Sequence, residues 1–187
     1  MKKICTLFIV LGASVAACTV SENNTFPRPT AYPRPQLPDT VMIATNLAPL
    51  HFLANRDAVV SSTRDGWLDI AYPSLGATVH VTFTRSTPRD IASVKENRME
   101  RLMLNAGDRP ITFSEFTNAA GFNVLSAKTE ASTTPLQFLA TDDSEWVVSG
   151  AVYFSSPGVV NAHDSIRPMI DAINYDILRS LKSLHRL

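Results

Sequence analysis

The sequence predicts an α+β fold, an antiparallel β-sheet with helices packed on it. Two observations predict the sheet. A pair of strand-like segments joined by a tight turn lies at residues 67–83, and a second such pair lies at residues 122–141. A third observation is the helical pattern between residues 87 and 107, with a longer one after residue 164. Strands joined by short turns run antiparallel, and helices with one apolar stripe cover a sheet face.

The first half of the predicted sheet consists of a short strand and a hairpin. Residues 50–53 form the short strand, and residues 67–72 pair with residues 77–83 across a Pro-Ser-Leu-Gly turn. The last of these strands alternates, with Thr78, His80 and Thr82 on one face and apolar residues on the other (Ala77, Val79, Val81 and Phe83). Such alternation is typical of a strand with one buried face. We therefore expect His80 to be exposed or hydrogen-bonded.

A helix is predicted after this hairpin. Thr87 is expected to cap it, with Pro88 at the first helical position and Asp90 completing a capping-box-like arrangement. Gly107 is expected to end it, and residues at helical spacing lie between (Ile91, Val94, Arg98, Leu102 and Met103). Residues 111–121 are ambiguous, and a short helix from Ser114 is one interpretation.

The second half of the chain repeats the plan of hairpin, strand and helix. Residues 122–128 pair with residues 136–141, and a turn at Asp142-Asp143-Ser144 leads into a strand at 146–154. The last helix is capped by Asp164 or Ser165, with Pro168 in its first turn, and carries one apolar stripe (Ile166, Met169, Ile170, Ile173, Ile177, Leu181 and Leu184). This order of elements is similar to the Mog1/PsbP-like αβ sandwich.

The first eighteen residues predict export and lipid attachment. Lys2 and Lys3 precede a short apolar run and the sequence Val15-Ala16-Ala17-Cys18. The run is shorter than the roughly 20 residues that a membrane-spanning helix needs, so it is typical of a removed signal peptide. The small residues before Cys18 resemble a bacterial lipobox, in which the cysteine is acylated. An ordinary signal peptide with a chance cysteine is the alternative.

The predicted organisation is a signal peptide at residues 1–17, a lipidated proline-rich tether at 18–40 and a single α+β domain at 41–187. Acyl chains on Cys18 would hold the protein on a membrane. Thr19, rather than aspartate, follows Cys18, which favours a periplasm-facing position on the outer membrane over the inner one. The full chain has 17 basic and 17 acidic side chains, and removal of residues 1–17 leaves 15 basic and 17 acidic ones. Without a basic excess, no nucleic-acid partner is expected.

The tether contains five prolines (Pro27, Pro29, Pro33, Pro35 and Pro38) and is expected to be an extended, semi-rigid spacer. A plain spacer is one interpretation. The alternative is that Tyr32, Arg34 and Leu37 dock on a partner, since a spacer does not need an aromatic and an aliphatic residue there. Thr40 lies in Asp39-Thr40-Val41, which resembles an O-glycosylation acceptor of Bacteroidetes.

The sequence contains no recognisable catalytic or metal-binding motif. Its four histidines lack zinc-site spacing, and glycine-rich phosphate loops and nucleophile elbows are absent. We therefore expect no enzyme activity, no metal and no cofactor. Aromatic residues at strand ends are expected in the core or at the sheet edge, with one or two of them lining a binding patch instead (Trp67, Trp146, Tyr153 and Phe154).

Five groups of residues carry a resemblance to a known family. They are Pro27-Arg28-Pro29-x-x-Tyr32 with Arg34, Leu37 and Pro38; Trp67-x-x-Ile70-x-x-Pro73 with Ala77-Thr78-Val79-His80; Gln137-Phe138-x-x-Thr141-Asp142; Gly150-Ala151-x-Tyr153-Phe154; and Asp164-Ser165-x-x-Pro168 with Asp176-Ile177. Together they resemble the gliding-motility lipoprotein GldD family of Bacteroidetes. The chain departs from the family pattern in the middle helix and at Ser149, where a basic residue is expected.

The resemblance implies a non-catalytic cell-envelope lipoprotein that is needed for gliding and linked to type IX secretion. Its partners would be the membrane, through the lipid on Cys18, and other motility or secretion proteins of the envelope. Two alternatives remain at this point: a periplasmic lipoprotein that binds a small ligand or glycan, and an enzyme with a scattered active site.

Overall fold

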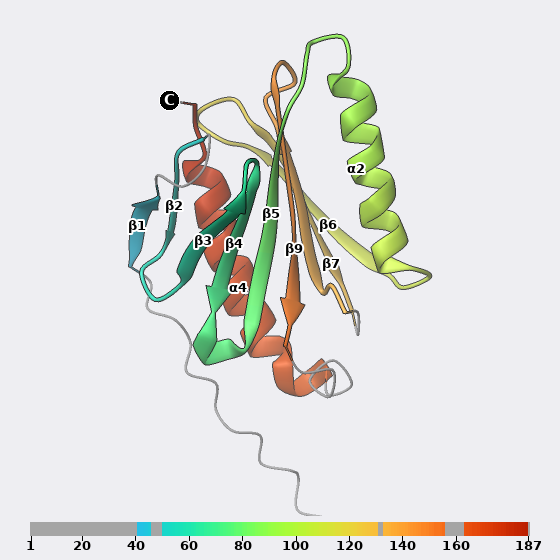
Figure 1. The fold of residues 1–187 in the computed structure, drawn as a ribbon. Helices are drawn as coiled ribbons and strands as arrows, with labels where there is room; N and C mark the ends of the chain where they lie inside the picture. The colour runs from blue at the N-terminus through green and yellow to red at the C-terminus, as the bar shows by residue number, and fades with distance from the viewer. Residues whose placement is uncertain (1–40, 46–49, 131–132, 156–162, 187) are drawn as a thin grey trace, which may run out of the picture. The chain divides into compact units, whose positions relative to one another are not determined.

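The computed structural model describes residues 41–45, 50–130, 133–155 and 163–186 (Figure 1). The candidate lipid-attachment, docking and glycosylation residues Cys18, Tyr32, Arg34, Leu37 and Thr40 lie outside these ranges. The described elements are β1 (Met42–Thr45), β2 (Phe52–Asn55), β3 (Val59–Arg64), β4 (Trp67–Tyr72), the short 3₁₀ helix η1 (Pro73–Leu75), β5 (Ala77–Arg85), α2 (Ile91–Ala106), β6 (Ile111–Thr117), β7 (Asn123–Thr129), β8 (Leu136–Thr141), β9 (Trp146–Phe154) and α4 (His163–Ser183).

Seven of these strands form one antiparallel sheet in the order β3-β4-β5-β9-β8-β7-β6, while β1 and β2 pair in a separate hairpin. The two predicted hairpins are present, with β4 paired to β5 and β7 paired to β8. The long strands β5 and β9 pair along their whole length at the centre of the sheet. The predicted α+β class, with helices on an antiparallel sheet, is confirmed.

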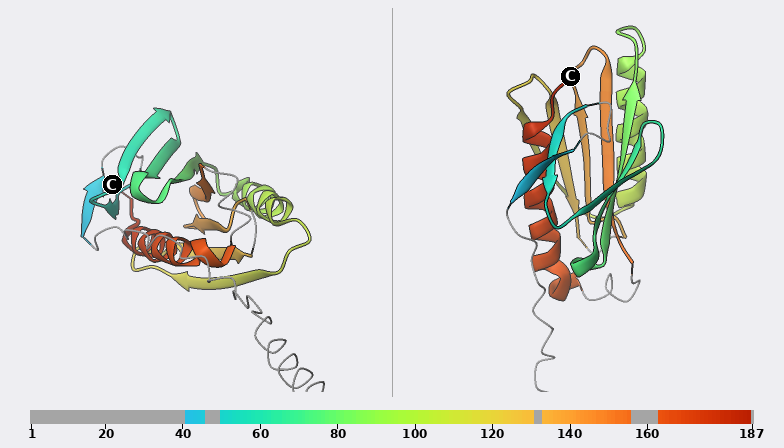
Figure 2. Two further views of the ribbon diagram at one scale, coloured as in Figure 1. Left: turned by 90° about the horizontal axis from the view of Figure 1, so that it is seen from below. Right: turned by 60° about the vertical axis from the view of Figure 1, so that its left-hand side comes forward.

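The two helices lie on opposite faces of this sheet, as Figure 2 shows. The alternation predicted for β5 is confirmed, because its apolar face joins the main core with Ile173, Ile177 and Leu181 of α4. Leu139 of β8 and Val147 of β9 instead pack with Ile91 of α2 in a smaller cluster. Strand β8 is buried at every position because both of its faces are covered.

The C-terminal end of α4 is attached by hydrogen bonds to β2 and to the loop between β6 and β7. The Ser183 hydroxyl accepts from the Leu53 amide at 2.8 Å, and the backbones of His51 and His185 bond to each other in both directions. The Asn118 side chain donates to the carbonyls of Leu181 and Leu184. The last carbonyls of a helix have no intrahelical donor, so these contacts fix where the helix ends.

The interpretation of residues 111–121 as containing a short helix from Ser114 was wrong. Residues 111–117 form the edge strand β6, paired with β7 from Ile111 opposite Thr129 to Thr117 opposite Asn123. Most of β6 is exposed, so it lacks the alternating burial by which a strand is recognised. Strands β1 and β3 were also not predicted. The turn between β3 and β4 uses Gly66 at φ +74°, where an added Cβ would lie 2.8 Å from the Phe83 carbonyl oxygen.

Both helix starts differ from the prediction. Helix α2 is preceded by Asp90, and the Thr87 carbonyl, rather than its hydroxyl, accepts from the Asp90 and Ile91 amides. The Thr87 hydroxyl donates to the Asp90 carboxylate at 2.7 Å. Helix α4 begins at His163, so Asp164 and Ser165 lie inside its first turn instead of capping it.

The end of α2 was predicted correctly, but one position of its stripe was not. The Gly107 amide donates to the Met103 and Leu104 carbonyls and closes the helix. Met103 is 47% exposed and faces solvent rather than the sheet. Among the described residues, no helix has the length and apolar character needed to cross a membrane.

Candidate functional site

A hollow that combines aromatic, basic and amide side chains lies where the C-terminal half of α2 meets the outer face of β4, β5 and β9. We call it the α2 groove and define it by Trp67, His80, Arg98, Arg101, Gln137 and Tyr153. Its volume is about 200 Å³. Pockets that bind small molecules combine a concave shape, ring surfaces and a few convergent polar groups, and the groove has all three.

Strand register decides which side chains meet on this face. Trp67 lies opposite Thr82, and Asp69 lies opposite His80. On the next strand, Ala151 lies opposite His80, and Tyr153 lies opposite Thr78. Trp67, His80 and Tyr153 therefore lie on a diagonal across three neighbouring strands. Trp67 and Tyr153 are each 40% exposed, although the aromatic residues of a sheet are usually covered.

His80 forms the centre of the diagonal. Its Nδ1 lies 2.7 Å from an Asp69 carboxylate oxygen, and its ring centroid lies 5.3 Å from that of Tyr153. The expectation of an exposed, hydrogen-bonded histidine is confirmed. The Asp69 contact orients the imidazole. Over residues 41–45, 50–130, 133–155 and 163–186, no serine or threonine hydroxyl hydrogen-bonds to His80.

Two arginines of α2 form the wall of the groove. Arg98 donates from Nη2 to the Thr84 hydroxyl at 3.0 Å, and Arg101 donates from Nε to the Asn97 side-chain oxygen at 3.1 Å. Partial burial, and then the charge of Arg101, hold the pKa of Arg98 below its usual value. Neither guanidinium forms an ion pair with a described carboxylate. The wall therefore carries two neighbouring positive charges without a neutralising partner.

The floor of the groove is polar and rigid. The buried Gln137 amide donates to the Leu102 carbonyl at 3.2 Å and accepts from the Asn105 amide at 3.0 Å, so it joins β8 to α2. Gly150 of β9 pairs with Phe138 of β8, and its missing side chain faces the α4 side of the sheet. A Cβ at Gly150 would lie 2.3 Å from the Phe138 ring, so only glycine lets this ring pack against the central strands.

The acidic turn Asp142-Asp143-Ser144 is structural, as the sequence predicted. One Asp142 oxygen accepts from the amides of Ser144, Glu145 and Trp146 at 2.8 to 3.0 Å, and the other accepts from Arg186. Burial alone would raise the pKa of Asp142, but these donors together hold it well below its usual range. Both carboxylate oxygens of Asp142 therefore hold the turn and the C-terminal segment in place.

A second carboxylate, Asp176 of α4, is buried away from the groove and is 3% exposed. It accepts from the Asn55 amide at 2.6 Å and so ties the β1–β2 hairpin to α4. Burial raises the pKa of Asp176. Burial, and then the charge of Asp176, also raise the pKa of Tyr72 above its usual range. No described pocket opens onto this pair, and its hydrogen bond has a structural purpose.

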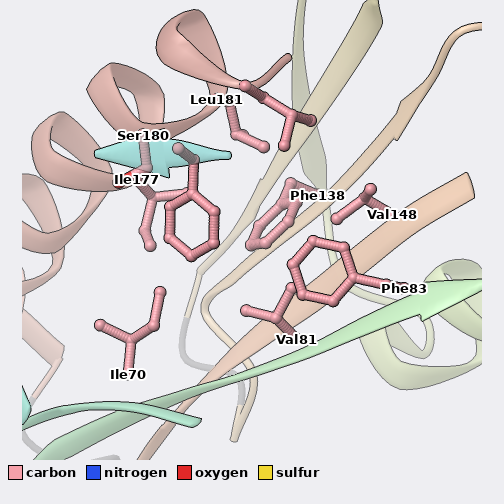
Figure 3. A pocket seen from close by; sticks show the side chains of 10 residues that line it. Ile70, Val81, Phe83, Phe138, Val148, Ile177, Ser180 and Leu181 are labelled. Atoms are coloured by element: carbon pink, nitrogen blue, oxygen red, sulfur yellow. The ribbon is translucent and has the colours of Figure 1, made fainter. Parts of the chain in front are cut away.

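The face of the sheet that α4 covers is filled by side chains. Figure 3 shows Phe83, Phe138 and Val148 pointing toward Ile177 and Leu181, around a cavity of about 20 Å³. That volume is close to the minimum for one water molecule, and the lining is almost entirely apolar. This cavity is too small to hold a ligand among these core side chains.

The sequence predicted only part of the groove. Trp67 and Tyr153 line it, whereas Trp146 and Phe154 pack against the main core. Arg98, Arg101 and Gln137 were not predicted as site residues. The sequence does contain one indication for the two arginines. No acidic residue lies three or four positions from either of them, so neither has a partner for an ion pair along its own helix.

No metal centre is formed by the described residues, since no three histidine, cysteine or acidic side chains gather closely enough to hold an ion. The chain matches a family model described as Gliding motility lipoprotein GldD over residues 22–185. No curated protein matches the chain.

Proposed function

The chain belongs to the gliding motility lipoprotein GldD family, and on this premise we propose that it is a non-catalytic envelope lipoprotein of the gliding-motility and type IX secretion machinery. It acts there through contacts with other envelope subunits. The observation that carries the proposal is the family match, which extends from the tether to residue 185, just past the end of α4.

The proposed anchor is the lipid on Cys18, after removal of a signal peptide at residues 1–17. Two or three acyl chains hold a protein on a membrane, since each buried methylene contributes about 0.8 kcal/mol. The tether at residues 18–40 then carries a domain at 41–187 away from the lipid surface. Thr19 favours the outer membrane, with the domain facing the periplasm.

The distribution of perturbed groups supports a role without catalysis. Active sites gather titratable groups with shifted pKa values in one cleft. Here Asp142 and Asp143 are bound into a turn, with Asp143 held by Lys95 at 2.5 Å, and Asp176 is buried against the β1–β2 hairpin. The α2 groove is lined by cations, amides and rings, without a carboxylate free to act as a base.

The test is chemical crosslinking with mass spectrometry on intact cells, comparing the natural protein with Tyr32→Ala and Arg34→Ala. We expect crosslinks from residues 19–40 to motility or secretion subunits, and we expect both substitutions to remove them. Tyr175→Ala is the matched control, because Tyr175 is a 56% exposed tyrosine on α4. Its crosslinks should not change.

Unchanged crosslinks in the tether variants would make residues 19–40 a spacer and move the docking surface to the domain. An absence of reproducible crosslinks to any envelope subunit would contradict the proposed function itself. The anchor is tested separately by labelling cells with a palmitate analogue, which should reach the natural protein and not Cys18→Ser.

A further inference from the structure

We propose that the α2 groove is a binding site for a carboxylate-bearing saccharide. This site goes beyond the proposed function, because it concerns a ligand held on the sheet and needs no partner subunit. The inference rests on the charge of the groove wall, the diagonal of rings on its base and the position of the groove within the sheet.

The wall supplies an anion-binding pair. Arg98 and Arg101 stand one helical turn apart, and neither meets a carboxylate among the described residues. Arg98 donates one N–H group to the neutral oxygen of Thr84, and Arg101 donates one to that of Asn97. Most N–H groups of each guanidinium therefore remain free for a ligand. A guanidinium presents a planar fork that matches the two oxygens of a carboxylate. A bound carboxylate would also relieve the repulsion between the two cations.

The base supplies ring surfaces at regular spacing. Each step of the diagonal, from Trp67 to His80 and from His80 to Tyr153, moves to the next strand and two residues along it. Strand spacing and residue rise place neighbouring Cα atoms about 8 Å apart, so the diagonal is about 16 Å long. One face of Trp67 already carries the Arg64 guanidinium, 3.7 Å from the ring centroid, which leaves its other face and its indole N–H. Aromatic faces bind the C–H surface of other rings, a tryptophan N–H donates a hydrogen bond, and a tyrosine hydroxyl donates or accepts one. The diagonal is long enough for a short chain of rings.

The position of the groove favours a saccharide over a peptide. Strands β4, β5 and β9 are interior strands whose backbone groups are paired on both sides, so a peptide cannot add to them as a further strand. A peptide lying across the rings would therefore bond its amides only to side chains and water, without the regular hydrogen bonds of an added strand. The hydroxyls of a saccharide can instead bond to Thr82, Ser149 and the amide of Asn105, which also line the groove.

The proline-rich tether of the same chain is a poor occupant. Proline-rich segments do bind aromatic grooves, but Arg28 and Arg34 of the tether have the same charge as Arg98 and Arg101. Like charges brought together on binding are unfavourable. Charge complementarity therefore points to an anionic ligand from outside the chain.

The experiment is isothermal titration calorimetry on the full-length lipoprotein in micelles of an uncharged detergent. The ligands are a trisaccharide of galacturonic acid, the neutral trisaccharide of galactose, and a short glutamate peptide of matched charge. We expect the acidic trisaccharide to bind at least about tenfold more tightly than either of the others, since charge-assisted bidentate contacts contribute more than neutral ones. Its affinity should fall as salt is raised.

Arg101→Gln should weaken this binding about tenfold or more, and Arg101→Lys should weaken it less because the charge stays and the fork is lost. The matched control is Arg167→Gln, since Arg167 is an exposed arginine of α4 on the other side of the sheet, beside Glu130 at 3.4 Å. It removes the same charge and should change affinity less than twofold.

Ser149→Lys adds a cation inside the groove and should tighten binding about threefold, a gain that cannot come from misfolding. The proposal is overturned if the acidic trisaccharide does not bind, if the neutral one binds equally well, or if the glutamate peptide binds more tightly. Equal losses in Arg101→Gln and Arg167→Gln would also overturn it. These results are independent of the tether crosslinks, so either proposal can fail without the other.

Discussion

Asn118→Ala measures how firmly α4 is held against the rest of the fold. Asn118 lies between β6 and β7 and is 8% exposed. Its side-chain amide donates to the carbonyls of Leu181 and Leu184 at 2.9 and 2.8 Å. Its side-chain oxygen accepts from the amides of Ala120 and Phe122 at 3.0 and 2.9 Å. Alanine removes all four hydrogen bonds and fills none of the space.

The expected loss of stability follows from these four contacts. A net hydrogen bond contributes about 1 kcal/mol, and a buried group left unpaired costs about 1 to 3 kcal/mol. The Leu181 carbonyl keeps a long contact to the Leu184 amide at 3.4 Å, and the Ala120 amide lies near the surface, so neither is fully orphaned. We therefore expect about 3 kcal/mol, which corresponds to a fall in Tm of about 10 °C in a domain of this size.

The assay is urea denaturation followed by tryptophan fluorescence, with the same Cys18→Ser background in each protein to remove the lipid. Asn123→Ala is the matched control, because Asn123 is an exposed asparagine that also makes two side-chain contacts, to Thr117 and Asp143. It should lose less than about 1 kcal/mol. Equal losses in the two variants, or a loss below about 1 kcal/mol for Asn118→Ala, would refute the reasoning.

Three further expectations concern the turn, the floor of the groove and the anchor. The pKa of Asp142 is lower in the folded chain than its value of about 3.9 in an unfolded one, so its contribution to stability is present above that value and is lost as the pH falls below it. The stability difference between the natural protein and Asp142→Asn, measured by urea denaturation, should therefore shrink from pH 6 to pH 3, and a constant difference would count against the assignment. Gly150→Ala should cost about 2 kcal/mol or more, because the buried Phe138 ring must move, and an unchanged Tm in thermal denaturation would contradict this. Cys18→Ser should move the protein from the membrane fraction to the soluble fraction, and retention in the membrane would disprove the lipid anchor.

Elements with a local pattern were predicted closely. The β4–β5 hairpin has a proline-containing turn and an alternating strand, so both its position and its buried face followed from adjacent residues. The edge strand β6 has no such pattern, since one side of it faces solvent and its partner β7 alone determines its structure. Strand pairing is non-local, and it decided an assignment that residues 111–117 by themselves left open.

The candidate site was predicted less completely than the fold. Trp67, His80 and Tyr153 could each be assigned to a strand, but the diagonal they form depends on the register of β4, β5 and β9. Arg98 was interpreted as an ordinary helix position, and Arg101 was not singled out. They became site residues because α2 packs over β8 and β9 and presents its basic side to the uncovered part of the sheet.

The sequence by itself determined the kinds and order of most elements, the polar and apolar faces of β5, and the turn chemistry at Asp142. These features depend on backbone and side-chain preferences within a few residues of each other. The tertiary structure alone decided the strand order, the placement of α2 and α4 on opposite faces, and the meeting of Arg98 and Arg101 with three rings. Those outcomes depend on burying apolar surface between segments far apart in the chain, which no short stretch of sequence encodes.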